Sequence, residues 1–233
     1  PQMAASSKVL NMIDTSNSPT KLLAIIGNTR GALEAANEEK LEILGFPYSI
    51  SDTFLHKNIN SGIEVVFKQT IDIKKICDAA DKKLRVYMSM AFGNPYGDTW
   101  SEQILLDEVK KLVENGIQII TLSDTIGLGT PEMITSIFEK MTLQFSNIEI
   151  GIHLHTKPQD AYAKLEAAWN AGCRNFDGVL NGFGGCPMTG YELLGNLNTL
   201  EILRFFESKN ITTSIDNRKA KEIALHYSSF AAL

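Results

Sequence analysis

Two histidines that stand two positions apart, His153 and His155, end an apolar run at residues 148–155, IEIGIHLH. Successive side chains of a β-strand point to opposite faces, so two residues at this spacing share one face and can reach the same point. Imidazole pairs of this kind can hold a metal ion, and they also occur as hydrogen-bonded histidines without a metal. The pair marks a candidate metal site, and the residues around it must decide between the two interpretations.

A glycine-rich segment at residues 181–196, NGFGGCPMTGYELLGN, carries further side chains that could take part in such a site. An amide oxygen such as that of Asn196 suits a hard cation, and a thiol near a cation, here Cys186, can act as an acid or a nucleophile. The glycines could instead only shape a turn, with Cys186 as a small buried side chain. A dinucleotide-binding loop is disfavoured because Pro187 stands where the third glycine of that motif belongs.

These candidates lie within a regular alternation of short apolar runs and longer amphipathic stretches. Such alternation is typical of right-handed βαβ units that build a parallel sheet. The fold is then a doubly wound open sheet or a (β/α) barrel, and in both the functional side chains gather where the strands end. We expect strands at residues 21–28, 41–51, 84–90, 118–124, 148–155 and 175–182. Their ends carry the polar residues Ser49, Ser51, Ser89, Ser123, Asp124, His153, His155 and Asn181.

The stretches between the runs have helical spacing and signals for helix ends. In residues 62–83 the apolar side chains recur about once per helical turn, with lysines and aspartates between them. Serine and threonine favour the start of a helix, proline its first turn, and asparagine or glycine its end. We expect helices to begin at Ser101, Thr130 with Pro131, Thr199 and Asp216, and to end at Asn115 with Gly116 and at Gly172.

The length and bulk composition fit one large globular domain or two small ones. The chain has 233 residues, of which 44% are hydrophobic, and a formal net charge of -5, so it offers no overall attraction for nucleic acid or an anionic membrane. Its apolar runs are shorter than the roughly 20 residues that a membrane-spanning helix needs. The 3 cysteines are too few for a disulfide scaffold and predict free thiols in a reducing compartment.

Three motifs in this order resemble the 3-hydroxy-3-methylglutaryl-CoA lyase family of TIM-barrel metallolyases. They are DTIGLGTP at 124–131, HLH at 153–155 and GFGGCPMTGYELLGN at 182–196, and PQMA, HKNIN and FGNPYGD at 1–4, 56–60 and 92–98 are similar to further parts of the family. The resemblance implies an α/β fold, a (β/α)8 TIM barrel. In this chain we expect an incomplete barrel of about six parallel strands followed by C-terminal helices.

The resemblance also implies roles for individual residues. His153, His155 and Asn196 correspond to ligands of a divalent cation, Mg²⁺ or Mn²⁺, and His153 also lies near the path of the transferred proton. Cys186 corresponds to a proton donor on a mobile loop that closes over the substrate. Asp124 corresponds to an active-site aspartate near the metal and the substrate, although an aspartate in this place could also cap a helix.

The resemblance further implies the reaction and the partners. We expect cleavage of 3-hydroxy-3-methylglutaryl-CoA to acetyl-CoA and acetoacetate by a homodimer in a bacterial cytoplasm, with the mitochondrial matrix as the alternative compartment. Lys57 and Asn58 are expected in a βα loop, where they could meet the CoA part of the substrate or simply face solvent.

Two alternatives stay open at this point. One is a condensing synthase of the same barrel group, which would use acetyl-CoA to make isopropylmalate, homocitrate or citramalate. The other is a non-catalytic barrel with a decayed site, which is favoured by Thr156 and Lys157 where the family has an aspartate and a threonine. Asn94 also replaces a cysteine of some members.

The family begins with a strand that carries an adjacent arginine and aspartate, followed by a strand that ends in a glutamate. No matching segment occurs in residues 1–233, which we interpret as a single, N-terminally truncated catalytic domain. Because that aspartate would be the only anionic ligand of the metal, we expect residues 1–233 alone to be inactive, to bind metal weakly and to aggregate.

Overall fold

The computed structural model describes residues 6–185 and 194–231, with side chains up to residue 227. Its centre is one sheet of 6 strands in the order β1-β2-β3-β4-β5-β6, and every neighbouring pair is parallel. The strands are β1 (Leu22–Ile25), β2 (Leu41–Ser49), β3 (Lys83–Ser89), β4 (Ile119–Asp124), β5 (Glu149–Leu154) and β6 (Asn175–Asp177). Each of them lies within a run that the sequence predicts, or within one residue of it.

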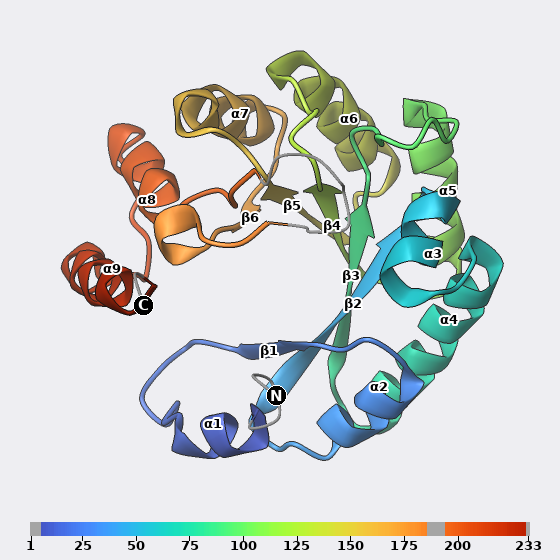
Figure 1. The fold of residues 1–233 in the computed structure, drawn as a ribbon, viewed down its shortest axis with the longest axis horizontal. Helices are drawn as coiled ribbons and strands as arrows, with labels where there is room; N and C mark the ends of the chain where they lie inside the picture. The colour runs from blue at the N-terminus through green and yellow to red at the C-terminus, as the bar shows by residue number, and fades with distance from the viewer. Residues whose placement is uncertain (1–5, 186–193, 232–233) are drawn as a thin grey trace.

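The first helix precedes the first strand, the other helices come after strands, and the helices lie around the outside of the curved sheet (Figure 1). They are α1 (Ser6–Met12), α2 (Thr29–Ala36), α3 (Asp52–Ile59), α4 (Ile63–Ala79), α5 (Glu102–Glu114), α6 (Pro131–Gln144), α7 (Pro158–Asn170), the 3-10 turn η1 (Leu180–Gly182), α8 (Thr199–Ser208) and α9 (Asn217–Ala231). Within the described residues, no helix is both long and apolar enough to cross a membrane.

The predicted helix ends are confirmed in detail. The Ser101 hydroxyl accepts a hydrogen bond from the amide of Ile104 at the start of α5, and the Thr130 hydroxyl accepts one from Met133 at the start of α6. Gly116 follows α5 with a φ of +86°, a left-handed conformation that glycine adopts without a steric penalty. Local chemistry therefore sets where these helices begin and end.

Sequential strand order with helices on one side identifies a barrel rather than a doubly wound sheet. The two edge strands β1 and β6 pair with one neighbour each, so the sheet of the described residues is a half-barrel that is open between them (Figure 1). The expected incomplete barrel is confirmed. The last strand is shorter than predicted, because the chain turns into η1 after Gly178 and Asn181 adopts a left-handed φ of +62°.

The two faces of the sheet differ in character. Paired residues in neighbouring parallel strands point to the same side, and the register pairs Ser49 with Ser89, Ser123 with His153, and His153 with Asp177. These polar side chains share the inner, concave face. The alternate residues face the helices and are fully buried: Leu44, Phe46, Val86, Met88, Ile120, Leu122 and Ile152.

The expected placement of Lys57 and Asn58 in a loop is wrong. Lys57 and Asn58 do not lie in a loop but in the last turns of α3. This short helix forms because the Ser51 hydroxyl caps its start and Asn60, in a left-handed conformation, closes it. The exposed Lys57 ammonium lies 4.5 Å from the centre of the Tyr96 ring, on the loop after β3.

Gly45 of β2 leaves room for side chains on the inner face. A Cβ atom at this position would lie 2.5 Å from Cδ1 of Ile25 and 2.9 Å from the Tyr87 ring. We predict that Gly45→Ala lowers the free energy of unfolding by about 1–3 kcal/mol, as overpacking does in tight contacts. Gly27→Ala is the matched control, because nothing lies within 4 Å of its added Cβ. Urea unfolding of both variants measures the difference, and equal stabilities would contradict the packing described here.

Candidate active site

His153 and His155 lie on the same face, as the sequence predicts. Their ring centroids are 5.3 Å apart, and the Tyr87 ring packs edge-on against His153 at 6.2 Å. Side chains on opposite faces of the sheet could not approach in this way. The two imidazoles can therefore serve one site on the concave side of the half-barrel.

One ring nitrogen of His155 forms a hydrogen bond that fixes the orientation of the ring. It is 6% exposed, and its Nδ1 lies 3.0 Å from the carbonyl oxygen of Leu194. Because a carbonyl only accepts, Nδ1 carries the proton and Nε2 keeps its lone pair for a ligand. Burial lowers the pKa of His155, which favours the neutral imidazole that a metal requires.

His153 is oriented in the same way, with Nε2 available for a ligand. Its Nδ1 lies 3.4 Å from Oδ2 of Asp177, an acceptor on β6, and is a buried atom without a hydrogen bond to the described residues. Both histidines thus turn Nδ1 toward an oxygen, which is the arrangement of histidines that bind metals through Nε2.

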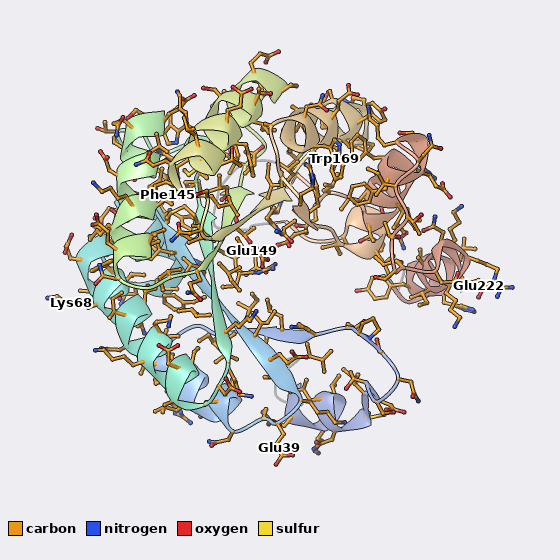
Figure 2. All side chains as sticks on the ribbon, turned by 180° about the vertical axis from the view of Figure 1, so that it is seen from behind. Glu39, Lys68, Phe145, Glu149, Trp169 and Glu222 are labelled. Atoms are coloured by element: carbon orange, nitrogen blue, oxygen red, sulfur yellow. The ribbon has the colours of Figure 1, made fainter. Side chains whose placement is uncertain are left out.

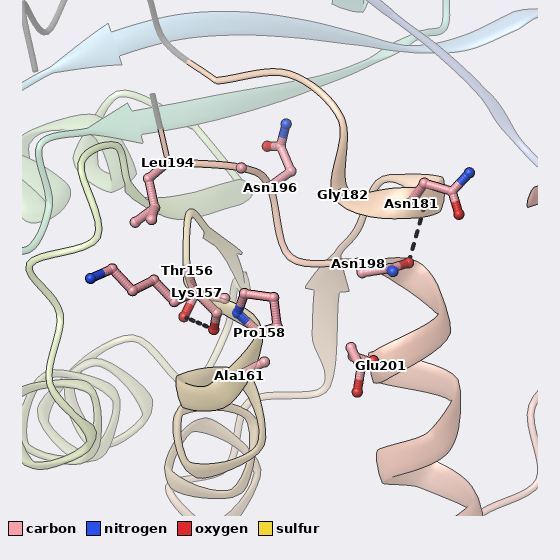
Figure 3. Close-up of a pocket in the computed structure, with 11 residues that line it drawn as sticks. Thr156, Lys157, Pro158, Ala161, Asn181, Gly182, Leu194, Asn196, Asn198 and Glu201 are labelled. Carbon is pink, nitrogen blue, oxygen red and sulfur yellow. Dashed lines mark hydrogen bonds between the residues drawn. The ribbon is translucent and has the colours of Figure 1, made fainter. Parts of the chain in front are cut away.

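Asn196 stands beside the pair. It forms an antiparallel bridge with His155, and side chains of residues bridged in this way lie on the same side. The Asn196 amide nitrogen donates to the carbonyl oxygen of Phe183 at 2.7 Å, so its amide oxygen is left to accept or to coordinate. In Figure 3 the Asn196 amide and the Glu201 carboxylate point in opposite directions, and the amide faces away from Pro158.

Gly182 and Gly184 pass so close to Asn196 that a side chain would not fit, and both also lie in turns. A Cβ at Gly182 would lie 2.8 Å from the Asn196 carbonyl oxygen, and one at Gly184 would lie 3.0 Å from its amide nitrogen. Both glycines have positive φ angles of +67° and +94°. Cys186, the predicted proton donor, and the rest of its loop up to residue 193 lie outside the described residues.

The described donors fit a divalent cation in type and orientation. Two neutral imidazoles and one amide oxygen suit Mg²⁺ or Mn²⁺, but they carry no negative charge. Among residues 6–185 and 194–231, no cluster of three or more histidine, cysteine or acidic side chains could hold a metal. The histidine pair and Asn196 therefore supply part of a coordination sphere.

Asp124 ends β4 next to the histidine pair, and its backbone carbonyl oxygen accepts the His155 amide at 3.3 Å. One residue after Ser123 on β4, its side chain points to the opposite, helix-facing side and is 1% exposed. Its Oδ2 accepts the Lys164 ammonium at 3.1 Å and the Gly129 amide at 3.0 Å. Its role as the active-site aspartate implied by the resemblance stays a prediction. The helix-cap alternative is not met, since Thr130 caps α6.

The Asp124–Lys164 pair fixes the loop after β4. The Lys164 ammonium also donates to the carbonyl oxygen of Gly127 at 3.3 Å, and a Cβ at Gly127 would collide with Leu194, whose carbonyl oxygen contacts His155. Burial raises the pKa of Asp124, while the charge of Lys164 opposes that rise. The pair thus supports the segment against which His155 is held.

Sequence reasoning misses three residues near the site: Arg85, Lys164 and Asp177. A signal for Arg85 was present, because LRVYMS alternates polar and apolar side chains, and Arg85, Tyr87 and Ser89 share the inner face. Asp177 lies in a run that we expected to be a strand, at a position that pairs with His153. Lys164 gave no signal, since one lysine on an amphipathic helix is normally solvated.

The other described cysteines are not candidates for catalysis. Cys77 and Cys173 are buried free thiols, as predicted. Burial raises the pKa of Cys77 to about 11 and that of Cys173 to about 12, so neither forms a thiolate at neutral pH.

A cavity of about 240 Å³ lies directly beside Asn196 (Figure 3). Thr156, Lys157 and Pro158 at the start of α7 form one wall, and Asn181, Asn198 and Glu201 form another. The two departures from the family pattern, Thr156 and Lys157, therefore shape the surroundings of the site without replacing a candidate ligand.

Comparison with known proteins identifies the family of this chain. A family model described as HMGL-like matches residues 1–225. The chain belongs to the HMGL-like family. The hydroxymethylglutaryl-CoA lyase of Pseudomonas mevalonii is 28% identical over 98% of this chain and 75% of its own length. The mitochondrial hydroxymethylglutaryl-CoA lyase of Macaca fascicularis is 30% identical over 95% of this chain and 67% of its own length.

A solved structure supports the assignment of this HMGL-like chain. The crystal structure of the Bacillus subtilis HMG-CoA lyase superposes with a TM-score of 0.88 and 28% identity, covering 97% of this chain and 74% of that protein. The fold and the enzyme family expected from the sequence are confirmed.

The Asp124–Lys164 pair leads to a stability prediction. Lys164→Met leaves a buried carboxylate without its partner, and such changes cost about 3–5 kcal/mol of unfolding free energy. The double variant Asp124→Asn with Lys164→Met should recover part of this loss. The control, Lys75→Met, removes an exposed pair with Asp72 and should cost about 0–1 kcal/mol. Denaturant unfolding compares the variants, and a Lys164→Met protein as stable as the control would refute the buried pair.

Proposed function

We propose that this protein cleaves 3-hydroxy-3-methylglutaryl-CoA to acetyl-CoA and acetoacetate with a divalent cation, Mg²⁺ or Mn²⁺. The observation that carries the proposal is the placement of His153 and His155 on one face, both with Nδ1 turned toward an oxygen, next to Asn196. Membership of the HMGL-like family and the printed names of the relatives support the substrate.

In this proposal His153 and His155 bind the cation through Nε2, and Asn196 binds it through its amide oxygen. The cation, when bound, lowers the pKa of the C3 hydroxyl of the substrate. His155 and Asn196 are fixed for this role by backbone carbonyls, those of Leu194 and Phe183. The ligands are therefore oriented before any ion arrives, which reduces the cost of forming the site.

The proposed reaction breaks the bond between C2 and C3. A base on the side of His153 accepts the hydroxyl proton, the oxygen becomes the ketone of acetoacetate, and the bonding electrons pass to C2 as a thioester enolate. The thiol of Cys186 then donates a proton to C2 and acetyl-CoA results. Cys186 receives this role from the family resemblance, together with its position between Gly184 and Asn196 in the chain.

The remaining partner assignments follow the family resemblance. We place the CoA part of the substrate near α3, where the exposed Lys57 offers a positive charge and Asn58 an amide. We also propose a homodimer that works in a bacterial cytoplasm or in the mitochondrial matrix. The formal net charge of -5 supports the expectation that nucleic acid is not a partner.

The test is a lyase assay on the protein expressed with any segment that its gene encodes before Pro1. We predict release of acetoacetate that depends on added Mg²⁺ or Mn²⁺. Cys186→Ala should lower kcat by about 10²–10⁴-fold, as removal of a general acid does, without weakening metal binding. His155→Ala should lower kcat and also weaken metal binding.

The controls separate this proposal from the alternatives. Cys77→Ala removes a buried thiol far from proton transfer and should keep the wild-type kcat. Condensation of acetyl-CoA with a keto acid, without acetoacetate release, would identify a synthase instead. A wild-type protein that binds metal but cleaves no substrate would contradict the lyase proposal.

A further inference from the structure

Four ionisable side chains form a continuous chain across the inside of the half-barrel. Arg85 on β3 contacts Glu149 on β5, with 3.1 Å between Nη2 and Oε1. Arg85 also contacts Asp177 on β6, with 3.4 Å between Nη1 and Oδ1. The other carboxylate oxygen of Asp177 lies 3.4 Å from Nδ1 of His153. The order Glu149, Arg85, Asp177, His153 thus ends on a proposed metal ligand.

This arrangement depends on the curvature of the sheet. Strands β3 and β6 are not neighbours, because β4 and β5 lie between them, so Arg85 must reach across the concave face. Small residues make the crossing possible: Gly45 is the register partner of Arg85, and a Cβ at Gly151 would lie 3.1 Å from Asn175. Glu149 is the first residue of β5; it appears near the centre of the view in Figure 2, and its side chain is 40% exposed.

The contact between Arg85 and Asp177 is shielded more than surface ion pairs are. The side chain of Arg85 is 16% exposed and that of Asp177 is 22% exposed. Burial raises the pKa of Tyr87 to about 12, and the nearby charge of Asp177 adds to the rise, so this phenol stays neutral beside the pair. Partly shielded ion pairs hold their geometry better than solvated ones, and two carboxylates fix the Arg85 guanidinium from two sides.

We propose that Asp177 is a positioning residue: it accepts the Nδ1 proton of His153 and so presents Nε2 to the cation, while Arg85 holds the Asp177 carboxylate in place. This inference rests on the proposed function of the site. The inference adds to that function a partner for His153. Asp177 would orient His153 as the carbonyl oxygen of Leu194 orients His155. Nδ1 of His153 lies 3.4 Å from Oδ2 of Asp177 without a hydrogen bond, and we expect this separation to shorten to hydrogen-bond distance when Nε2 is bound.

The alternative roles of these residues give different results. If Asp177 were itself a ligand, its loss would abolish metal binding and change the number of oxygen ligands. If the four residues only stabilised the barrel, their loss would change stability and leave the affinity of the folded protein for metal unaltered.

The decisive experiment uses the protein expressed with any segment that its gene encodes before Pro1, and measures Mn²⁺ affinity by calorimetry, with Mn²⁺ as the only ligand, for wild type, Asp177→Asn and Arg85→Gln. We expect Asp177→Asn to weaken Mn²⁺ binding about 10–100-fold, which is typical of residues that orient a metal ligand. Arg85→Gln should act in the same direction, and the double variant should be no weaker than Asp177→Asn alone, because both act through one contact. Asp72→Asn, at an exposed pair on α4, is the control and should bind as wild type does.

The wild-type protein provides a second readout that does not depend on the folding of a variant. Nitrogen-15 NMR of the imidazoles should show the Nδ1-protonated tautomer for His153. An Nε2-protonated tautomer would overturn the proposal, and so would wild-type Mn²⁺ affinity in folded Asp177→Asn protein. Complete loss of binding with a changed Co²⁺ absorption spectrum would make Asp177 a ligand and also overturn it. Failure of the wild type to bind Mn²⁺ would instead refute the proposed function.

Discussion

The in-register pairing of β4, β5 and β6 is the constraint on which the candidate site depends. It puts Ser123, His153 and Asp177 in one row on the concave face, and it turns Asp124 and Leu154 toward the helices. A shift of one residue in β5 would send both histidines into the apolar layer against α6 and α7. The fully buried residues Leu122 and Ile152 make that shift costly, because it would expose them on the concave side.

Two support systems hold the ends of these strands from opposite sides. On the outer side, Lys164 and Asp124 fix the loop after β4, which packs against Leu194. On the inner side, the segment after residue 193 runs across the ends of β5 and β6. The Leu197 amide donates to Leu154, and the Val179 amide donates to Leu197. Asn196 is therefore held by backbone hydrogen bonds on both flanks.

Much of this architecture follows from local sequence. The apolar runs and helix caps predict the strands and most of the helices, since both depend on neighbouring residues. The spacing of His153 and His155 predicts their common face for the same reason. The same alternation rule places the Asp124 side chain on the face opposite to Ser123. Helix α3 went unrecognised because it is short and its caps enclose a weak pattern.

What the sequence could not predict depends on contacts between distant strands. Arg85 meets Asp177 only because the sheet curves enough to bring β3 toward β6. The bridge from Asn196 to His155 spans a loop whose path sequence spacing does not determine.

The central claim is that His153, His155 and Asn196 share one cation. The most direct measurement is a crystal structure of the protein with Mn²⁺, in which anomalous scattering locates the ion. The account predicts a single strong peak about 2.0–2.6 Å from Nε2 of both histidines and from the amide oxygen of Asn196. An ion bound elsewhere, or bound through an Nδ1 atom, would contradict it.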